Sequence, residues 1–71
     1  MNVRAYKIIT PPQIAAVLKL SALSYAGKQE AIEAFSTALK TENFTFRIKD
    51  SEWKTTFYND AGGELGIIEL R

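Results

Sequence analysis

The chain has 71 residues, 46% of them hydrophobic, and a net charge of +1 at pH 7. It contains no cysteine and no histidine, which excludes disulfides, thiolate nucleophiles, cysteine-based zinc sites and imidazole, the usual general base near neutral pH. We therefore expect a small folded protein, a single domain over residues 1–71, that is not an enzyme and holds no metal or cofactor.

The charges are divided unevenly along the chain. Residues 1–29 contain basic side chains and no acidic ones, and all eight carboxylates lie from Glu30 onward. This distribution is a mild indication of an acidic partner. It falls well short of the strongly basic composition that is typical of dedicated nucleic-acid-binding domains.

The apolar stretch at residues 14–26 follows basic residues and loosely resembles a signal peptide. Two prolines before it and Lys19 within it interrupt that pattern. No stretch approaches the roughly 18 apolar residues that a membrane span requires. Together with the lack of cysteine, these features favour a cytoplasmic protein with no membrane partner.

The first two elements are expected to be a strand and a helical region. Val3–Thr10 is rich in β-branched and aromatic residues, which predicts a strand, and the two prolines that follow end it. Apolar residues then recur at helical spacing over residues 12–40. One long helix or two helices broken near Ala26–Gly27 would both fit. We favour two, because a single helix of about 42 Å would overhang strands of about 27 Å.

The two parts of this helical region differ in character. Residues 28–40 have one apolar face, as expected of a helix packed on a sheet. The earlier part is apolar nearly all round, and Leu20 and Leu23 lie far from the stripe formed by Ile14 and Leu18. Surplus apolar surface on a small domain indicates a protein contact, and a homodimer is the commonest form. The alternative is that other parts of the chain cover these two leucines.

From Phe44 onward the apolar period is two. It predicts strands over residues 44–49, 53–58 and 64–70, joined by turns at Asp50–Glu52 and Asn59–Gly63. The acidic residues in these turns are explained by local hydrogen bonding. The expected fold is α+β, with the order strand, one or two helices and three strands, and with the helices packed on one face of an antiparallel sheet.

The alternation separates two faces of the predicted sheet. The face toward the helices would carry Phe44, Phe46, Ile48, Trp53, Thr55 and Phe57. We expect Phe46, Ile48 and Phe57 to be buried together with Phe35 of the second helix. The other face would carry Thr45, Arg47, Lys49, Lys54, Thr56 and Tyr58, to which the first strand could add Arg4 and Tyr6.

This second face supplies the candidate binding residues, which are Arg4, Tyr6, Arg47, Lys49, Lys54 and Tyr58. Arginine and tyrosine are enriched where proteins bind each other most tightly. Basic groups with tyrosines also hold nucleic acid on several sheet-based modules, and an ordinary solvated face has a similar composition. The leading hypothesis is a non-catalytic module that docks on a protein partner, such as a stand-alone regulator or inhibitor of the phage or mobile-element type. The alternative is a small nucleic-acid-binding protein.

Overall fold

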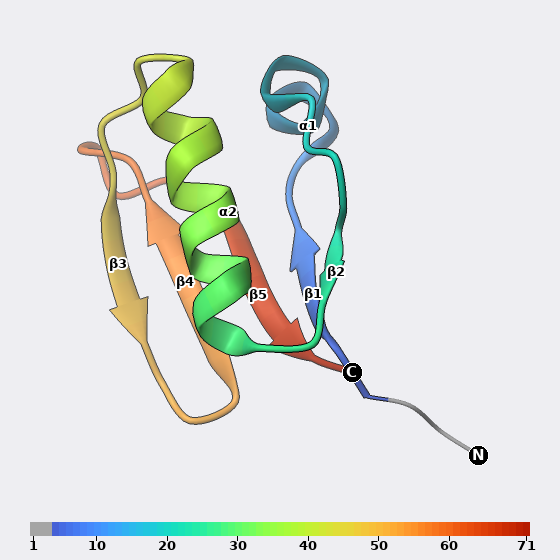
Figure 1. Ribbon diagram of the computed structural model, residues 1–71. Helices are drawn as coiled ribbons and strands as arrows, with labels where there is room; N and C mark the ends of the chain where they lie inside the picture. The colour runs from blue at the N-terminus through green and yellow to red at the C-terminus, as the bar shows by residue number, and fades with distance from the viewer. Residues whose placement is uncertain (1–3) are drawn as a thin grey trace.

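The computed structural model describes residues 4–71. Its elements are, in chain order, β1 (Tyr6–Ile9), α1 (Pro12–Leu18), β2 (Ser24–Tyr25), α2 (Lys28–Thr41), β3 (Arg47–Asp50), β4 (Lys54–Tyr58) and β5 (Glu64–Leu70). The strands form one antiparallel sheet in the order β2-β1-β5-β4-β3. As Figure 1 shows, α2 lies across one face of this sheet and α1 sits beyond the end of β1. The α+β class with helices packed on an antiparallel sheet is confirmed.

The helical region divides into two helices, as favoured, but at an earlier point than expected. Helix α1 ends at Leu18, because Lys19 takes the left-handed backbone conformation (φ 51°, ψ 49°) and donates its N–H to the Ala15 carbonyl. Such a left-handed residue commonly ends a helix. Helix α2 begins only after Gly27. Within residues 4–71 neither helix is long and apolar enough to cross a membrane.

The segment between the helices contains a strand that the helical spacing concealed. Ser24 and Tyr25 pair with Lys7 and Tyr6 of β1, and the Ile8 N–H donates to the Leu23 carbonyl at 2.9 Å. Residues 4–71 therefore form a sheet of five strands, where four were expected. A strand of two residues is too short to show a periodicity in the sequence. Its hydrogen bonds go to β1, which is distant along the chain.

The core lies between α2 and the central strands. Its buried apolar members are Ile8, Leu18, Ala31, Phe35, Leu39, Phe57, Leu65 and Ile68. The rings of Phe35 and Phe57 meet edge to face, with centroids 4.6 Å apart. Gly66 permits this approach, since a Cβ there would lie 2.7 Å from Cζ of Phe35. The helix thus rests on the sheet at a point where β5 has no side chain.

The predicted core is correct for Phe35 and Phe57 and wrong for Ile48. Phe46 is half-buried, 5.7 Å from Phe57 between ring centroids. Ile48 is 43% exposed, because β3 is the outermost strand and α2 packs against β1, β2 and β5. Trp53, also expected inside, is 65% exposed. It lies in the turn between β3 and β4, beyond the area that α2 covers.

Candidate functional site

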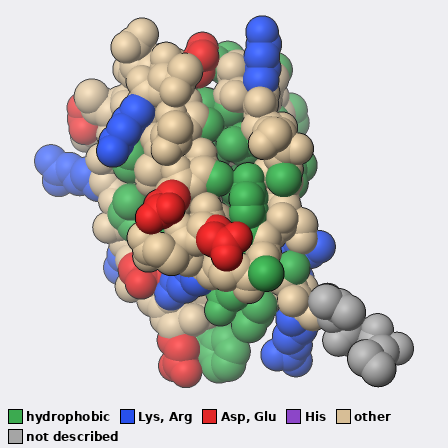
Figure 2. Space-filling model, in the orientation of Figure 1, with side chains coloured by type: hydrophobic (Ala, Val, Ile, Leu, Met, Phe, Trp, Pro, Cys, Tyr) green, Lys and Arg blue, Asp and Glu red, His purple; other side chains and the backbone are tan. Residues whose placement is uncertain are grey.

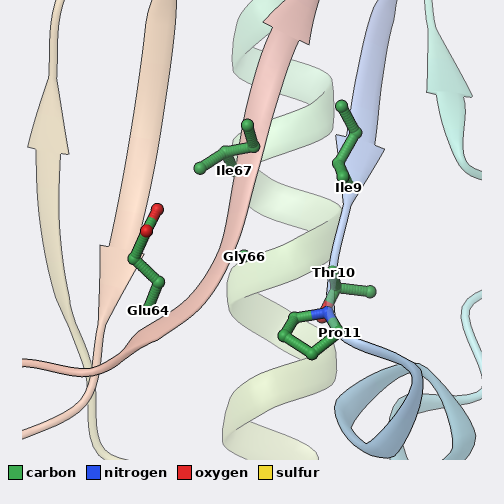
Figure 3. A pocket seen from close by; sticks show the side chains of 6 residues that line it. All are labelled: Ile9, Thr10, Pro11, Glu64, Gly66 and Ile67. Carbon is green, nitrogen blue, oxygen red and sulfur yellow. The ribbon is translucent and has the colours of Figure 1, made fainter.

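The face of the sheet opposite α2, hereafter the open face, can be read from the strand register. Residues opposite each other in antiparallel strands point to the same side. One row across the open face consists of Lys7, Glu69 and Lys54; the next of Ile9, Ile67, Thr56 and Lys49; and the third of Glu64, Tyr58 and Arg47. Figure 3 views part of this face with α2 behind the sheet. Neither helix of residues 4–71 covers this face (Figure 1).

The first feature of the open face is a hollow of about 380 Å³, here called the cationic hollow. It is lined by Lys49, Ser51, Lys54, Thr56, Tyr58 and Glu64. Thr56 is only 5% exposed, because it stands in a central strand between Lys49 and Ile67. The hollow therefore has two lysines and a tyrosine around a buried hydroxyl-bearing side chain.

Three cations of the open face form no ion pair with an acid within residues 4–71. The ion pairs in this part of the chain are Lys28–Asp50 and Arg71–Glu69. Arg47, Lys49 and Lys54 take part in neither of them. On the helix-covered side, acidic and basic side chains are scattered and do not gather by sign (Figure 2). The open face therefore carries three basic side chains that no carboxylate within residues 4–71 pairs.

The second feature is an apolar hollow of about 280 Å³ next to the cationic one. It is lined by Ile9, Thr10, Pro11, Glu64, Gly66 and Ile67 (Figure 3). The Thr10 hydroxyl donates to the Leu65 carbonyl at 2.7 Å, which ties the segment before α1 to β5. Glu64 lines both hollows, so they adjoin on the same surface.

Asp50 illustrates how an acid beside this surface is directed away from it. Lys28 Nζ lies 2.6 Å from Asp50 Oδ1, and the Thr55 hydroxyl donates to the same oxygen at 2.6 Å. These two hydrogen bonds, that of Lys28 first, lower the pKa of Asp50. Lys28 also donates to the Ser51 carbonyl at 3.0 Å. The carboxylate therefore fastens the first turn of α2 to the end of β3 and does not reduce the charge of the open face.

Four of the predicted binding residues share one surface. Arg47 lies opposite Tyr58, and Lys49 and Lys54 line the same hollow as Tyr58. Arg4 is exposed and precedes β1. Arg4 and the other four residues were all expected on the open face. The strand register places the four residues of β3 and β4 there.

Tyr6 is on the opposite side from the one predicted. It pairs with Tyr25 and Leu70, lies two residues from the buried Ile8 and packs against the core. The phase of β1 was ambiguous because Ile8 and Ile9 are adjacent and equally apolar. Lys7 takes the position on the open face instead, opposite Glu69.

The apolar hollow was missed at the level of sequence, although a signal for it existed. Adjacent residues of a strand point to opposite faces. The pairs Ile8–Ile9 and Ile67–Ile68 must therefore each place one isoleucine on the open face, which are Ile9 and Ile67.

The two leucines assigned to an oligomer interface lie outside any helix. Leu20 is half-buried against the core and lines a hollow of about 310 Å³ beside α2. Leu23 is 53% exposed, just before β2. The expectation of a helix apolar all round is wrong, because α1 ends at Leu18. Self-association through Leu20 and Leu23 remains a prediction.

Within residues 4–71 no group of three or more acidic side chains is placed to hold a metal ion. Comparison of the chain with protein-family models, curated proteins and solved structures finds no match. We therefore infer function from the geometry of the open face alone.

Proposed function

We propose that the protein is a non-catalytic interaction module of the cytoplasm that docks through its open face on an acidic surface of a partner protein. In this proposal it acts as a regulator or inhibitor of that partner. The observation that carries the proposal is the pair of adjoining hollows, one apolar and one cationic, on a sheet whose other face is closed by α2.

The composition of the open face fits a protein interface. Such interfaces have an apolar centre and a polar rim, and tyrosine and arginine are enriched in them. Here Ile9 and Ile67 provide the apolar part, while Arg47, Lys49 and Tyr58 lie beside it. Carboxylates of a partner would find cations that no acid within residues 4–71 already pairs.

A protein partner fits this face better than nucleic acid. Single-stranded nucleic acid binds where exposed aromatic rings stack on successive bases along a positive groove. Tyr58 is half-buried, and Tyr6 lies on the other face. Glu64 and Glu69 also stand among the cations of the open face and interrupt the continuous positive groove that a nucleic-acid strand follows. Nucleic acid is therefore the alternative that the test must exclude.

The test compares three immobilised proteins in extracts of the native host, each extract assayed with and without nuclease treatment. These are the unaltered protein, the double variant Arg47→Glu/Lys54→Glu and a control, Lys19→Glu/Lys40→Glu. The control makes the same change of charge at exposed positions on the helical side. We expect a partner that the unaltered protein and the control retain and that the open-face variant loses, because like charges would then face each other.

Two results would contradict the proposal. Equal retention of every bound protein by both variants would mean that the open face is only solvated surface. Retention that disappears with nuclease, and that falls steeply between about 50 and 200 mM salt, would indicate phosphate contacts and support the nucleic-acid alternative.

A further inference from the structure

The outer edge of β3 has hydrogen-bonding groups that the sheet does not use. Within residues 4–71, β3 pairs only with β4 and ends the strand order. The hairpin closes with the Ser51 N–H donating to the Lys54 carbonyl at 2.9 Å. Residues bonded to a given neighbour alternate along an antiparallel strand. Lys49 therefore directs its N–H and C=O toward β4, whereas Ile48 directs them away from the sheet.

The side chains along this edge are also exposed to solvent. Arg47 and Lys49 are exposed on the open face and belong to no ion pair within residues 4–71. Ile48 points to the other side and is 43% exposed. A further strand beside β3 would place alternate side chains next to these three. The matching pattern is acidic next to Arg47 and Lys49, and apolar next to Ile48.

A second copy of the chain does not supply this pattern. Two β3 strands paired antiparallel about a twofold axis perpendicular to the sheet place open face beside open face. In each register that overlaps the strands by more than one residue, Arg47 or Lys49 of one copy then lies beside Arg47 or Lys49 of the other. Like charges directly opposite are destabilising, and lysines on edge strands prevent such pairing in natural sheets. The occupant must carry the opposite charge.

We propose that β3 accepts an extended segment of the partner protein as a sixth strand, and that this segment alternates acidic and apolar residues. Its acidic side chains would lie on the open face beside Arg47 and Lys49. The inference rests on the proposed function, because these two cations belong to both the edge and the open face. Main-chain hydrogen bonds provide the affinity of an added strand, and its alternate side chains provide the specificity.

The test uses a capped synthetic peptide of about eight alternating glutamate and valine residues, and a second peptide with lysine in place of glutamate. Binding is measured to the unaltered protein, to Ile48→Pro and to its matched control Ile48→Val. Proline removes the outward N–H without removing a bond to β4, and edge strands tolerate it. We expect the glutamate peptide to bind the unaltered protein and Ile48→Val with the same affinity. Its affinity for Ile48→Pro should be about tenfold lower, because the hydrogen bond from the Ile48 N–H to the peptide is lost.

Amide exchange on the unaltered protein provides a second measurement that does not depend on the folding of Ile48→Pro. At saturating glutamate peptide, the Ile48 amide is expected to slow its exchange, while the Lys49 amide, already bonded to β4, stays unchanged. An Ile48 amide that exchanges at the same rate with and without peptide would overturn the proposal. So would equal binding of the lysine peptide, or no binding of the glutamate peptide at all.

The inference and the proposed function fail in different ways. If Arg47→Glu/Lys54→Glu loses the host partner while the peptide leaves Ile48 unprotected, the open face binds without strand addition, and only the inference falls. If the peptide protects Ile48 but both charge variants retain the same host proteins, the proposed docking through the open face is wrong.

Discussion

The two faces of the sheet are built from the same strands, yet their side chains make different contacts. On the helix side, Phe35 and Phe57 are fully buried against each other, and the Asp50 carboxylate is bonded to Lys28 and Thr55. On the open face, Arg47 and Lys49 have no ionic partner within residues 4–71. The difference indicates that stability resides on one face and that the other is free to bind. Each prediction below tests that separation.

The largest expected effect is on the helix side, at the aromatic contact. Phe57→Ala removes a fully buried ring that touches Phe35 and Phe46. The free energy of unfolding should fall by about 3–5 kcal/mol, which is enough to unfold a domain with so small a core. Circular dichroism during thermal unfolding measures it. A melting temperature close to that of the unaltered protein would show that this contact does not hold α2 on the sheet.

A smaller loss is expected where β5 has no side chain. Gly66→Ala would place a Cβ 2.7 Å from the Phe35 ring, so α2 or the ring must move. Overpacking of this kind costs about 1–3 kcal/mol. Chemical denaturation compares it with Gly27→Ala, where φ is −112° and the added Cβ would meet only the flexible Glu30 side chain, at 3.2 Å. If Gly66→Ala leaves stability unchanged, the close approach is not tight.

Asp50 should add a pH dependence to the helix side. Its pKa is lowered in the folded protein by Lys28 and then by Thr55. A carboxyl whose pKa is lower folded than unfolded stabilises above its unfolded pKa, and that contribution is lost as the pH falls through the folded pKa. Asp50→Asn should therefore reduce stability at neutral pH and flatten its decline below about pH 4. Denaturation midpoints measured from neutral pH to below about pH 4 test this. If the midpoints of the unaltered protein and of Asp50→Asn fall in parallel, Asp50 does not cause the pH dependence.

The smallest effect on stability is expected at Trp53. It is 65% exposed in the turn between β3 and β4, and exposed substitutions usually change stability by no more than about 0.5 kcal/mol. Trp53→Ala should leave the unfolding midpoint nearly unchanged. A large loss would mean that this ring packs on the protein and that the region around β3 is less open than described.

The period-two alternation after Phe44 was sufficient to predict the shared surface of Arg47, Lys49, Lys54 and Tyr58. This succeeded because side-chain direction in a strand depends only on local geometry. The exposure of Ile48 could not be predicted in this way. It depends on which strands α2 covers, and that is decided by the packing of the whole fold.

Two other errors have the same origin. The phase of β1 was undetermined because Ile8 and Ile9 suit either face, and only pairing with β5 resolves it. Strand β2 is too short to show a period, and its hydrogen bonds go to β1. The helical spacing of Leu18, Tyr25 and Ile32 continued through it by coincidence.

Site-specific photo-crosslinking in the native host tests most directly whether the open face is the binding face. A benzoyl-phenylalanine in place of Tyr58 places the reactive group in the cationic hollow, and one in place of Thr37 places it on an exposed position of α2. We predict a discrete crosslinked protein from Tyr58, sensitive to Arg47→Glu/Lys54→Glu, and none from Thr37. A crosslink from Thr37 alone would show that the partner binds the helix side and would contradict the account.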